Sequence, residues 1–383
     1  MKKALVAIIS IILIFAAGIL ICKPKETNEL VFWTLQMRDF SAYMQKVISE
    51  FETQNPEIKI KWVDVPFSEG EKRTLASILS DNPPDLINLN PDFSTLLAEK
   101  GTLKEFSDDE LSQFPKEIIA NLKINGKNYL IPWYATSAVT LYNKKYANEL
   151  KINPPRNYDE LFEICTNFKP KTVKSLIAMP LTDGDYSLKM LYKAGIDPLY
   201  GINSPQADKF LNNLKIAYDK GCIPKESVSM NHREALEKFM AGETVFFEGG
   251  ANFLNIIKEN ALETFKNVDI MPQITNDGYN FSMMNFVIPL KSKKRDDALK
   301  FALFLTNEAN QLELAKLTNV LATNDKALNS DLYTKTTGND LFGKARITSA
   351  KQLKNIQRSK YIPNRKDVVL KINCYVQKIL LHG

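Results

Sequence analysis

Two short stretches of the sequence carry groups that could hold a polar ligand without covalent chemistry. The first contains adjacent aromatic residues, Trp133 and Tyr134, within YLIPWYATSAVTLYNKKYANEL at residues 129–150. Aromatic faces cover apolar ligand surface, while the indole and phenol groups form hydrogen bonds. The second contains Gly249 and Gly250 ahead of a predicted helix. Backbone N–H groups there can approach a ligand closely because glycine has no side chain in the way.

Each stretch also has a plain structural interpretation. Residues 129–150 could form an ordinary buried strand pair, and Gly249-Gly250 could be only a tight turn. The position of residues 129–150 near the middle of a long chain favours a crossing between domains, where ligand sites tend to lie. The residues alone leave these alternatives open.

Catalysis receives little support from the residues present. The two histidines are His232, in a charged predicted helix, and His382, next to the C-terminus, so a nucleophile triad lacks a well-placed base. The sequence has no G-x-S-x-G, H-E-x-x-H, phosphate-loop or dinucleotide motif. A carboxylate pair for glycoside hydrolysis stays open, because sequence distance says nothing about spatial separation. We expect no enzyme activity, no cofactor and no metal site.

Length and charge suggest an ordinary globular protein with two domains. The 383 residues exceed what one hydrophobic core usually serves. The net charge of +6 comes from lysines scattered along the chain, without a basic block or an aromatic-basic motif. Nucleic-acid binding is therefore not expected.

The N-terminus predicts export from the cytoplasm. Lys2 and Lys3 precede eighteen uncharged residues, 4–21, and Cys22 follows at once. A cysteine directly after an apolar run is similar to the lipobox of bacterial lipoproteins, although Ile21 stands where a small residue is usual. An uncleaved membrane anchor is the competing interpretation, and a third is that Cys22 is incidental. Either leading interpretation tethers residues after 22 to the outer face of the cytoplasmic membrane.

The other cysteines show no spacing typical of a zinc site or a disulfide framework. Cys165 falls on the apolar face of a predicted helix, Cys222 follows a helix that ends at Gly221, and Cys374 lies beside a packing face. At most one disulfide can form among these three.

The elements that must position the candidate residues alternate between strand and helix. Strands at 30–34, 58–62 and 85–89 are separated by helices at 40–51 and 75–79, a pattern typical of a parallel sheet with helices on both faces. Such sheets bind ligands at the carboxyl ends of their strands. Residues 129–150 predict two short strands followed by a helix that begins after Asn143. Asn157 and Ser204 are predicted to cap further helices.

Seven segments in order resemble extracellular solute-binding proteins of bacterial ABC transporters, in the family that binds sugars. They are LVFWTL at 30–35, FETQNPEIKIKWVDVP at 51–66, PPDLINLN at 83–90, IPWYATSAVTLYNKKYANEL at 131–150, PPRNYDELFEIC at 154–165, FMAGETVFFEGGAN at 239–252 and IPLKSKKRDDALKFALFLTNEANQLELA at 288–315. The resemblance implies an α/β, two-lobed periplasmic-binding-protein-like clamp of type II, each lobe a mainly parallel sheet flanked by helices. It also implies a monomer that delivers its ligand to ABC permease subunits.

The resemblance further implies lobe boundaries and a ligand site between the lobes. Lobe one would comprise residues 28–137 and 288–328, and lobe two residues 138–287 and 329–383, after an export segment at 1–22. The residues implied to contact a sugar or oligosaccharide are Trp33, Gln36, Phe67, Asn90, Asp92, Trp133, Tyr134, Thr136, Asp183, Gly249, Gly250 and Asn285. The alternatives are the same fold with a non-sugar solute, such as a polyamine, a metal or another small polar ligand, or a sensory surface protein without transport.

Overall fold

The computed structural model describes residues 29–170, 173–318, 320–336, 338, 340–356, 362 and 364–382. The predicted export segment and Cys22 lie outside the described residues, as does the side chain of Phe67. In the part of the chain that is described, no helix is both long and apolar enough to span a membrane.

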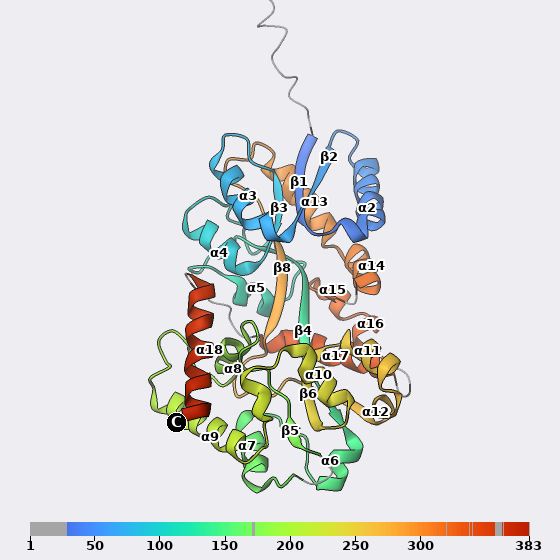
Figure 1. The fold of residues 1–383 in the computed structure, drawn as a ribbon. Helices are drawn as coiled ribbons and strands as arrows, with labels where there is room; N and C mark the ends of the chain where they lie inside the picture. The colour runs from blue at the N-terminus through green and yellow to red at the C-terminus, as the bar shows by residue number, and fades with distance from the viewer. Residues whose placement is uncertain are drawn as a thin grey trace, which may run out of the picture.

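Two long strands connect an upper and a lower lobe (Figure 1). The first half of β4 (Ile131–Asn143) pairs antiparallel with β8 (Phe281–Val287) in the upper lobe. Its second half pairs antiparallel with β6 (Thr244–Gly250) and β7 (Val268–Met271) in the lower lobe. The predicted crossing is therefore present, but it is one strand rather than two short ones. The irregular register between Pro132 and Tyr134 accounts for the apparent break, because proline has no N–H for the ladder.

The upper lobe has a mixed sheet. Strand β1 (Glu29–Leu35) lies parallel to β2 (Lys59–Val65) and β3 (Leu86–Leu89), as the sequence predicts. Strand β8 pairs antiparallel with β3, so the expected mainly parallel sheet is interrupted where the chain returns from the lower lobe. The helices before β4 are α2 (Ser41–Gln54), α3 (Phe67–Leu79), α4 (Pro91–Glu99) and α5 (Lys116–Leu122), with a 3₁₀ turn η1 (Arg38–Phe40).

The lower lobe surrounds the second half of β4. Strand β5 (Ser175–Ile177) pairs parallel with β6, whereas the β4 pairs are antiparallel, so this sheet is also mixed. Asn157 and Ser204 each accept a backbone hydrogen bond at a helix start, which confirms the two predicted caps, and Asn143 caps α6 in the same way. The helices are α6 (Lys144–Leu150), α7 (Tyr158–Asn167), α8 (Tyr186–Lys193), α9 (Pro205–Asp219), η2 (Lys225–Val228), α10 (His232–Met240), α11 (Phe253–Asn260) and α12 (Leu262–Asn267).

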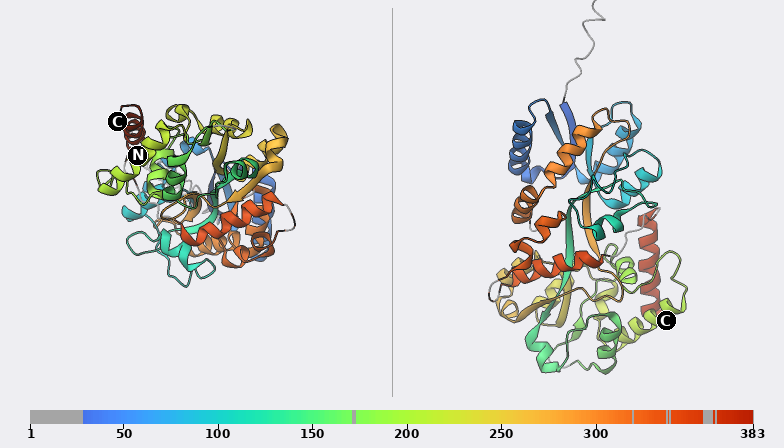
Figure 2. Two further views of the ribbon diagram at one scale, coloured as in Figure 1. Left: turned by 90° about the horizontal axis from the view of Figure 1, so that it is seen from below. Right: turned by 180° about the vertical axis from the view of Figure 1, so that it is seen from behind.

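The chain after β8 serves both lobes. Helix α17 (Leu341–Gln352) packs on β4 and β7 at the crossing, and α18 (Arg365–His382) packs on α8 and α9 (Figure 2). Between them and β8 lie α13 (Arg295–Leu305), α14 (Glu308–Thr318), β9 (Leu321–Ala322), α15 (Asp325–Leu328) and α16 (Asp331–Thr334), and η3 (Leu353–Asn355) follows α17.

Residues near two of the predicted lobe boundaries pack in the cores of the upper lobe. Met283 and Phe286 already pack in the cores of the upper lobe, five and two residues before the boundary expected at 288. Tyr333 and Leu353 also pack there, although both were expected in lobe two. The hydrophobic pattern shows that a segment is buried but not which of two cores receives it.

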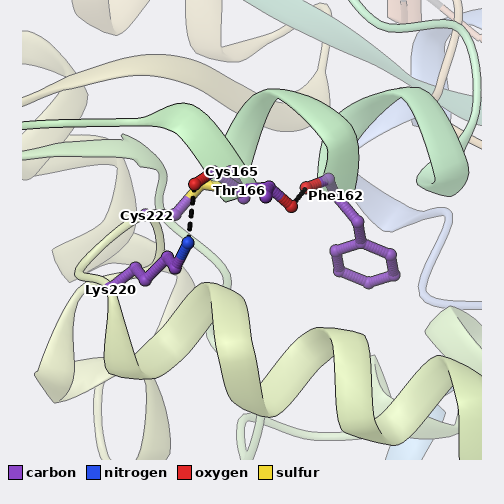
Figure 3. Close-up of a disulfide and its surroundings, with 5 residues drawn as sticks. All are labelled: Phe162, Cys165, Thr166, Lys220 and Cys222. Atoms are coloured by element: carbon purple, nitrogen blue, oxygen red, sulfur yellow. Dashed lines mark hydrogen bonds between the residues drawn. A yellow bond between two sulfur atoms is a disulfide. The ribbon is translucent and has the colours of Figure 1, made fainter.

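One cysteine pair forms a disulfide in the lower lobe (Figure 3). Cys165 of α7 and Cys222, just after α9, have Cα atoms 5.5 Å apart, and both residues are buried. Lys220 Nζ donates to the carbonyl oxygen of Thr166 at 2.6 Å beside this bond. Cys374 is exposed on α18 with a free thiol. The single pair that the cysteine count allowed is therefore Cys165–Cys222.

Candidate ligand-binding site

A cavity of about 510 Å³ lies where the crossing strands enter the lower lobe. Its wall combines the turn before α8, α8 itself, the first residue of α10, the end of β6 and short parts of β4 and β8. The lining residues are Thr136, Ser137, Ala138, Asp183, Gly184, Asp185, Tyr186, Lys189, Met190, Lys193, His232, Glu248, Gly249, Gly250, Asn252, Gln273, Asn280, Phe281 and Ser282.

The structure brings four of the predicted ligand contacts together in this wall: Thr136, Asp183, Gly249 and Gly250. The two glycines do not form the expected turn. They end strand β6 and pair with Val139 and Ala138 of β4. A β-carbon on Gly249 would approach the Phe247 and Phe253 rings to 2.6 and 2.8 Å, so glycine is needed there for packing.

The structure places Trp133 outside the cavity lining. This residue is fully buried in the upper lobe, and its ring stacks on Phe286 with centroids 4.6 Å apart, so no face is left for a ligand. Tyr134 packs edge-on against Trp133 and does not line the cavity, and burial raises its pKa to about 12. Asn285 is also fully buried, and its amide nitrogen donates to Ser94 Oγ at 3.0 Å. The two adjacent aromatic residues of the crossing strand thus belong to the hydrophobic core of the upper lobe.

The other predicted contacts belong to the upper lobe and do not line the cavity. Trp33 is half-buried against the core, and Gln36 is exposed with a positive φ of 53°. Asn90 caps α4 by accepting a hydrogen bond from the backbone of Phe93 at 2.8 Å. Asp92 lies 3.3 Å from Arg365 at the lobe interface. Whether these residues touch a ligand stays a prediction, as it does for Phe67.

A buried ion pair supports the cavity wall. Lys193 Nζ lies 2.5 and 2.6 Å from the two carboxylate oxygens of Glu248, and the side chains are only 3% and 13% exposed. Lys193 also lies over the Tyr158 ring, 5.7 Å from its centroid. Burial and the negative charge of Glu248 raise the pKa of Tyr158 and Tyr186 well above the usual value. Both phenols therefore stay neutral hydrogen-bonding groups.

A second set of charges closes one side of the cavity. Asp185 lies 3.0 Å from Lys189 and 2.7 Å from Arg365. Burial acts to raise the pKa of Asp185, but the positive charges of Lys189 and Arg365 hold it below its usual value. The lysines of the wall are thus neutralised by carboxylates of the same wall.

Asp183 and His232 form another part of the cavity wall. The backbone N–H of His232 donates to Asp183 Oδ2 at 2.8 Å, and no ion pair joins Asp183 to a cation among the described residues. The imidazole packs against both the Phe247 and the Phe253 rings, with centroids 5.1 and 5.2 Å away. Burial lowers the pKa of His232, opposed by the charge of Asp183. A neutral imidazole offers one donor and one acceptor.

Amide groups join the cavity to the crossing strands. Gln273 Nε2 donates to the carbonyl oxygen of Asn280 at 2.7 Å and to Ser137 Oγ at 3.1 Å. Gln352 of α17 accepts from the backbone of Gln273 at 2.8 Å and donates to Ser137 Oγ at 2.9 Å. The Gln273 Oε1 atom is buried and accepts no hydrogen bond from the described residues.

Sequence reasoning missed most of the charged wall. Lys193, Glu248 and His232 come from three distant segments, and each looks like an ordinary charged or polar residue in its local pattern. Glu248 is the one with a local signal, because it directly precedes the glycine pair. In the described part of the chain, no group of three His, Cys, Asp or Glu side chains is placed to hold a metal ion.

Comparison with known proteins gives consistent results. Residues 46–340 match the family model for bacterial extracellular solute-binding proteins. The multiple sugar-binding protein of Streptococcus mutans is 23% identical over 310 residues, covering 74% of this chain and 72% of that protein. The diacetylchitobiose-binding protein DasA of Streptomyces coelicolor is 24% identical over 324 residues, covering 79% and 75%.

Solved structures share the fold over nearly the whole chain. A protein described as an oligosaccharide periplasmic-binding protein from Synechococcus sp. MITs9220 has a TM-score of 0.78 at 27% identity, covering 92% of this chain and 93% of its own. A Staphylococcus aureus solute-binding protein in complex with maltose has a TM-score of 0.75 at 17% identity, covering 94% of each chain, which shows the fold alone. The two-lobed clamp and the family model together show that this chain belongs to the bacterial extracellular solute-binding proteins and is a binding receptor rather than an enzyme.

Proposed function

We propose that this receptor captures a sugar or an oligosaccharide in the cavity at the crossing strands and delivers it to an ABC importer. The observation that carries the proposal is the charge balance of the wall. Lys193 pairs with Glu248, and Lys189 pairs with Asp185. A wall in which both lysines are paired with carboxylates suits a neutral ligand with many hydroxyl groups, since such a ligand brings no further charge into the cavity. The remaining lining acid, Asp183, is a hydrogen-bond acceptor and also suits hydroxyl groups.

The paired groups still have hydrogen-bonding capacity for a ligand. Carboxylates and ammonium groups make stronger hydrogen bonds to hydroxyls than neutral groups do, and an ion pair fixes their directions. Tyr186 and Phe281 provide the aromatic surface of the wall, against which the apolar face of a sugar ring can pack. They replace Trp133 and Tyr134 in that role.

The relatives support a saccharide over the other solutes considered. The S. mutans and S. coelicolor proteins are named for a sugar and for diacetylchitobiose. A polyamine would require several unpaired carboxylates, whereas Asp183 is the one lining acid without a cation partner among the described residues. The charge pattern therefore gives no specific support to a polyamine.

The family is extracellular. The attachment of this chain to the membrane is a separate part of the proposal. We propose that Cys22 carries the lipid that holds a monomeric receptor at the outer face of the cytoplasmic membrane beside its permease. Mass spectrometry of membrane-extracted protein should find a mature N-terminus at diacylated Cys22. An intact N-terminus at Met1 would establish the uncleaved anchor instead.

Titration calorimetry against a saccharide panel tests the proposed ligand class. Asn252 lines the cavity at the end of β6, so Asn252→Ala should weaken saccharide binding by about tenfold. Asn260→Ala is the matched control, because Asn252 directly precedes α11 and Asn260 is the last residue of that helix, where its amide nitrogen donates to the carbonyl oxygen of Ile256 at 2.8 Å. Saturable binding of a polyamine or a metal, with no saccharide bound, would overturn the proposal.

A further inference from the structure

A second cavity adjoins the first on the other side of the end of β6. It has a volume of about 240 Å³ and shares Thr136, Ser137, Gly250 and Asn252 with the first cavity. The rest of its wall comes from both lobes and from α17: Ala251, Asn255, Thr318, Leu321, Phe342, Arg346 and Ser349. The four shared residues place the two cavities side by side at the crossing strands.

The second cavity differs from the first in its charge. Arg346 is its one charged lining residue. The Arg346 Nε atom donates to the carbonyl oxygen of Leu332 at 2.8 Å, which fixes the guanidinium plane, and no ion pair joins Arg346 to an acid within the described residues. Lys189 and Lys193 of the first cavity both have carboxylate partners. A half-buried cation without a counter-charge leaves an anion-binding position in the second cavity, whose other lining residues are neutral.

We infer that the ligand is an acidic oligosaccharide, with a neutral ring in the first cavity and a carboxylate or sulfate group held by Arg346 in the second. This inference rests on the proposed saccharide function. The guanidinium fork matches the geometry of two anionic oxygens. Asn255, Ser349 and Thr318 add neutral hydrogen-bonding groups around that position, and Phe342 adds apolar surface for the ring that carries the anion.

Pairs of saccharides that differ only in charge test the inference on the full-length receptor. The probes are trigalacturonate and its methyl ester, and a sulfated and an unsulfated galactobiose, which separate a carboxylate from a sulfate as the bound group. At least one acidic probe should bind about tenfold or more tightly than its neutral counterpart at low salt. This advantage should shrink as ionic strength rises, because the half-buried pair is partly screened.

Three variants identify the residue responsible. Arg346→Gln should remove the preference for the acidic probe, so that the acidic and neutral probes bind with similar affinity, while Arg346→Lys should keep part of the preference. Arg233→Gln is the matched control, since Arg233 is exposed on α10 and pairs only with Glu237. The unfolding temperature of each ligand-free variant shows whether it is folded.

The outcomes separate this inference from the proposed function. Neutral saccharides that bind as tightly as the acidic ones, or an acid preference that persists in Arg346→Gln, would overturn the inference and leave the saccharide receptor standing. Binding of none of the saccharides would overturn both.

Discussion

Arg365 and Asp92 meet across the two lobes. Arg365 Nη1 lies 3.3 Å from Asp92 Oδ2, and Nη2 of the same guanidinium lies 2.7 Å from Asp185 Oδ2. Asp92 belongs to α4 of the upper lobe, whereas Asp185 lines the cavity in the lower lobe. Helix α18 brings Arg365 to this position because its first turn lies beside the upper lobe and its body packs on α8 and α9 (Figures 1 and 2).

Arg365→Met should shift the receptor toward an open form. A partly exposed ion pair contributes about 1 kcal/mol, so the loss should weaken ligand affinity by about fivefold if binding requires closure. Calorimetry measures the affinity, and the radius of gyration of the ligand-free protein should increase. Arg156→Met, which breaks the Arg156–Glu160 pair within the lower lobe, should change neither quantity. Unchanged affinity in Arg365→Met would show that this bridge does not hold the lobes.

Lys193→Met should destabilise the lower lobe strongly. The variant leaves Glu248 buried without a counter-charge, and breaking a buried pair in this way costs about 3–5 kcal/mol. The double variant Lys193→Met with Glu248→Gln should lose much less, since no isolated charge remains. Denaturant unfolding measures both, with Arg233→Met as an exposed-pair control. Equal losses in the single and double variants would contradict this account of the pair.

Much of the fold follows from local sequence patterns. The stripe Tyr43, Met44, Val47 and Phe51 is buried on α2 as its spacing predicts, and β1, β2 and β3 lie in the expected parallel arrangement. Helix periodicity, caps and strand alternation are properties of neighbouring residues, so a single sequence reveals them. The sequence also predicts the crossing at residues 131–143, because apolar strand patterns lie on both sides of Pro132.

The ligand site is less predictable because it depends on contacts between distant segments. Trp133 is an aromatic residue on the crossing strand, but its burial depends on Phe286, which lies far along the chain. Lys193 of α8 and Glu248 of β6 form an ion pair only because folding brings these two distant segments together. Gly249 lines the cavity, and glycine is required there by packing against Phe247 rather than by a turn.

Acidification should lower the free energy of unfolding through the protonation of His232. Burial lowers its folded-state pKa below 6.5, so the unfolded chain binds more protons between the two pKa values. The free energy of unfolding should therefore fall as the pH drops below about 6.5, until the folded-state pKa is passed. His232→Gln should lose this part of the slope, and His382→Gln should retain it. A slope that survives in His232→Gln would assign the effect to other groups.

The disulfide should stabilise the lower lobe. Cys165 and Cys222 are separated by 57 residues, and closing a loop of that length contributes about 4 kcal/mol in the chain-entropy estimate. Replacing both cysteines by alanine should lower the free energy of unfolding by up to that amount, measured by denaturant titration. Cys374→Ser should have little effect, since that thiol is free and exposed. Equal stability of the oxidised protein and the double alanine variant would show that the bond contributes nothing.

Small-angle scattering during a saccharide titration tests the central claim most directly. The claim is that a saccharide binds between the lobes and shifts the population toward a closed clamp through contacts with both. The account predicts that the radius of gyration decreases in proportion to the calorimetric occupancy of a single site, and that Asn252→Ala requires more ligand for the same compaction. Compaction with a polyamine or a metal ion, and with none of the saccharides, would contradict it.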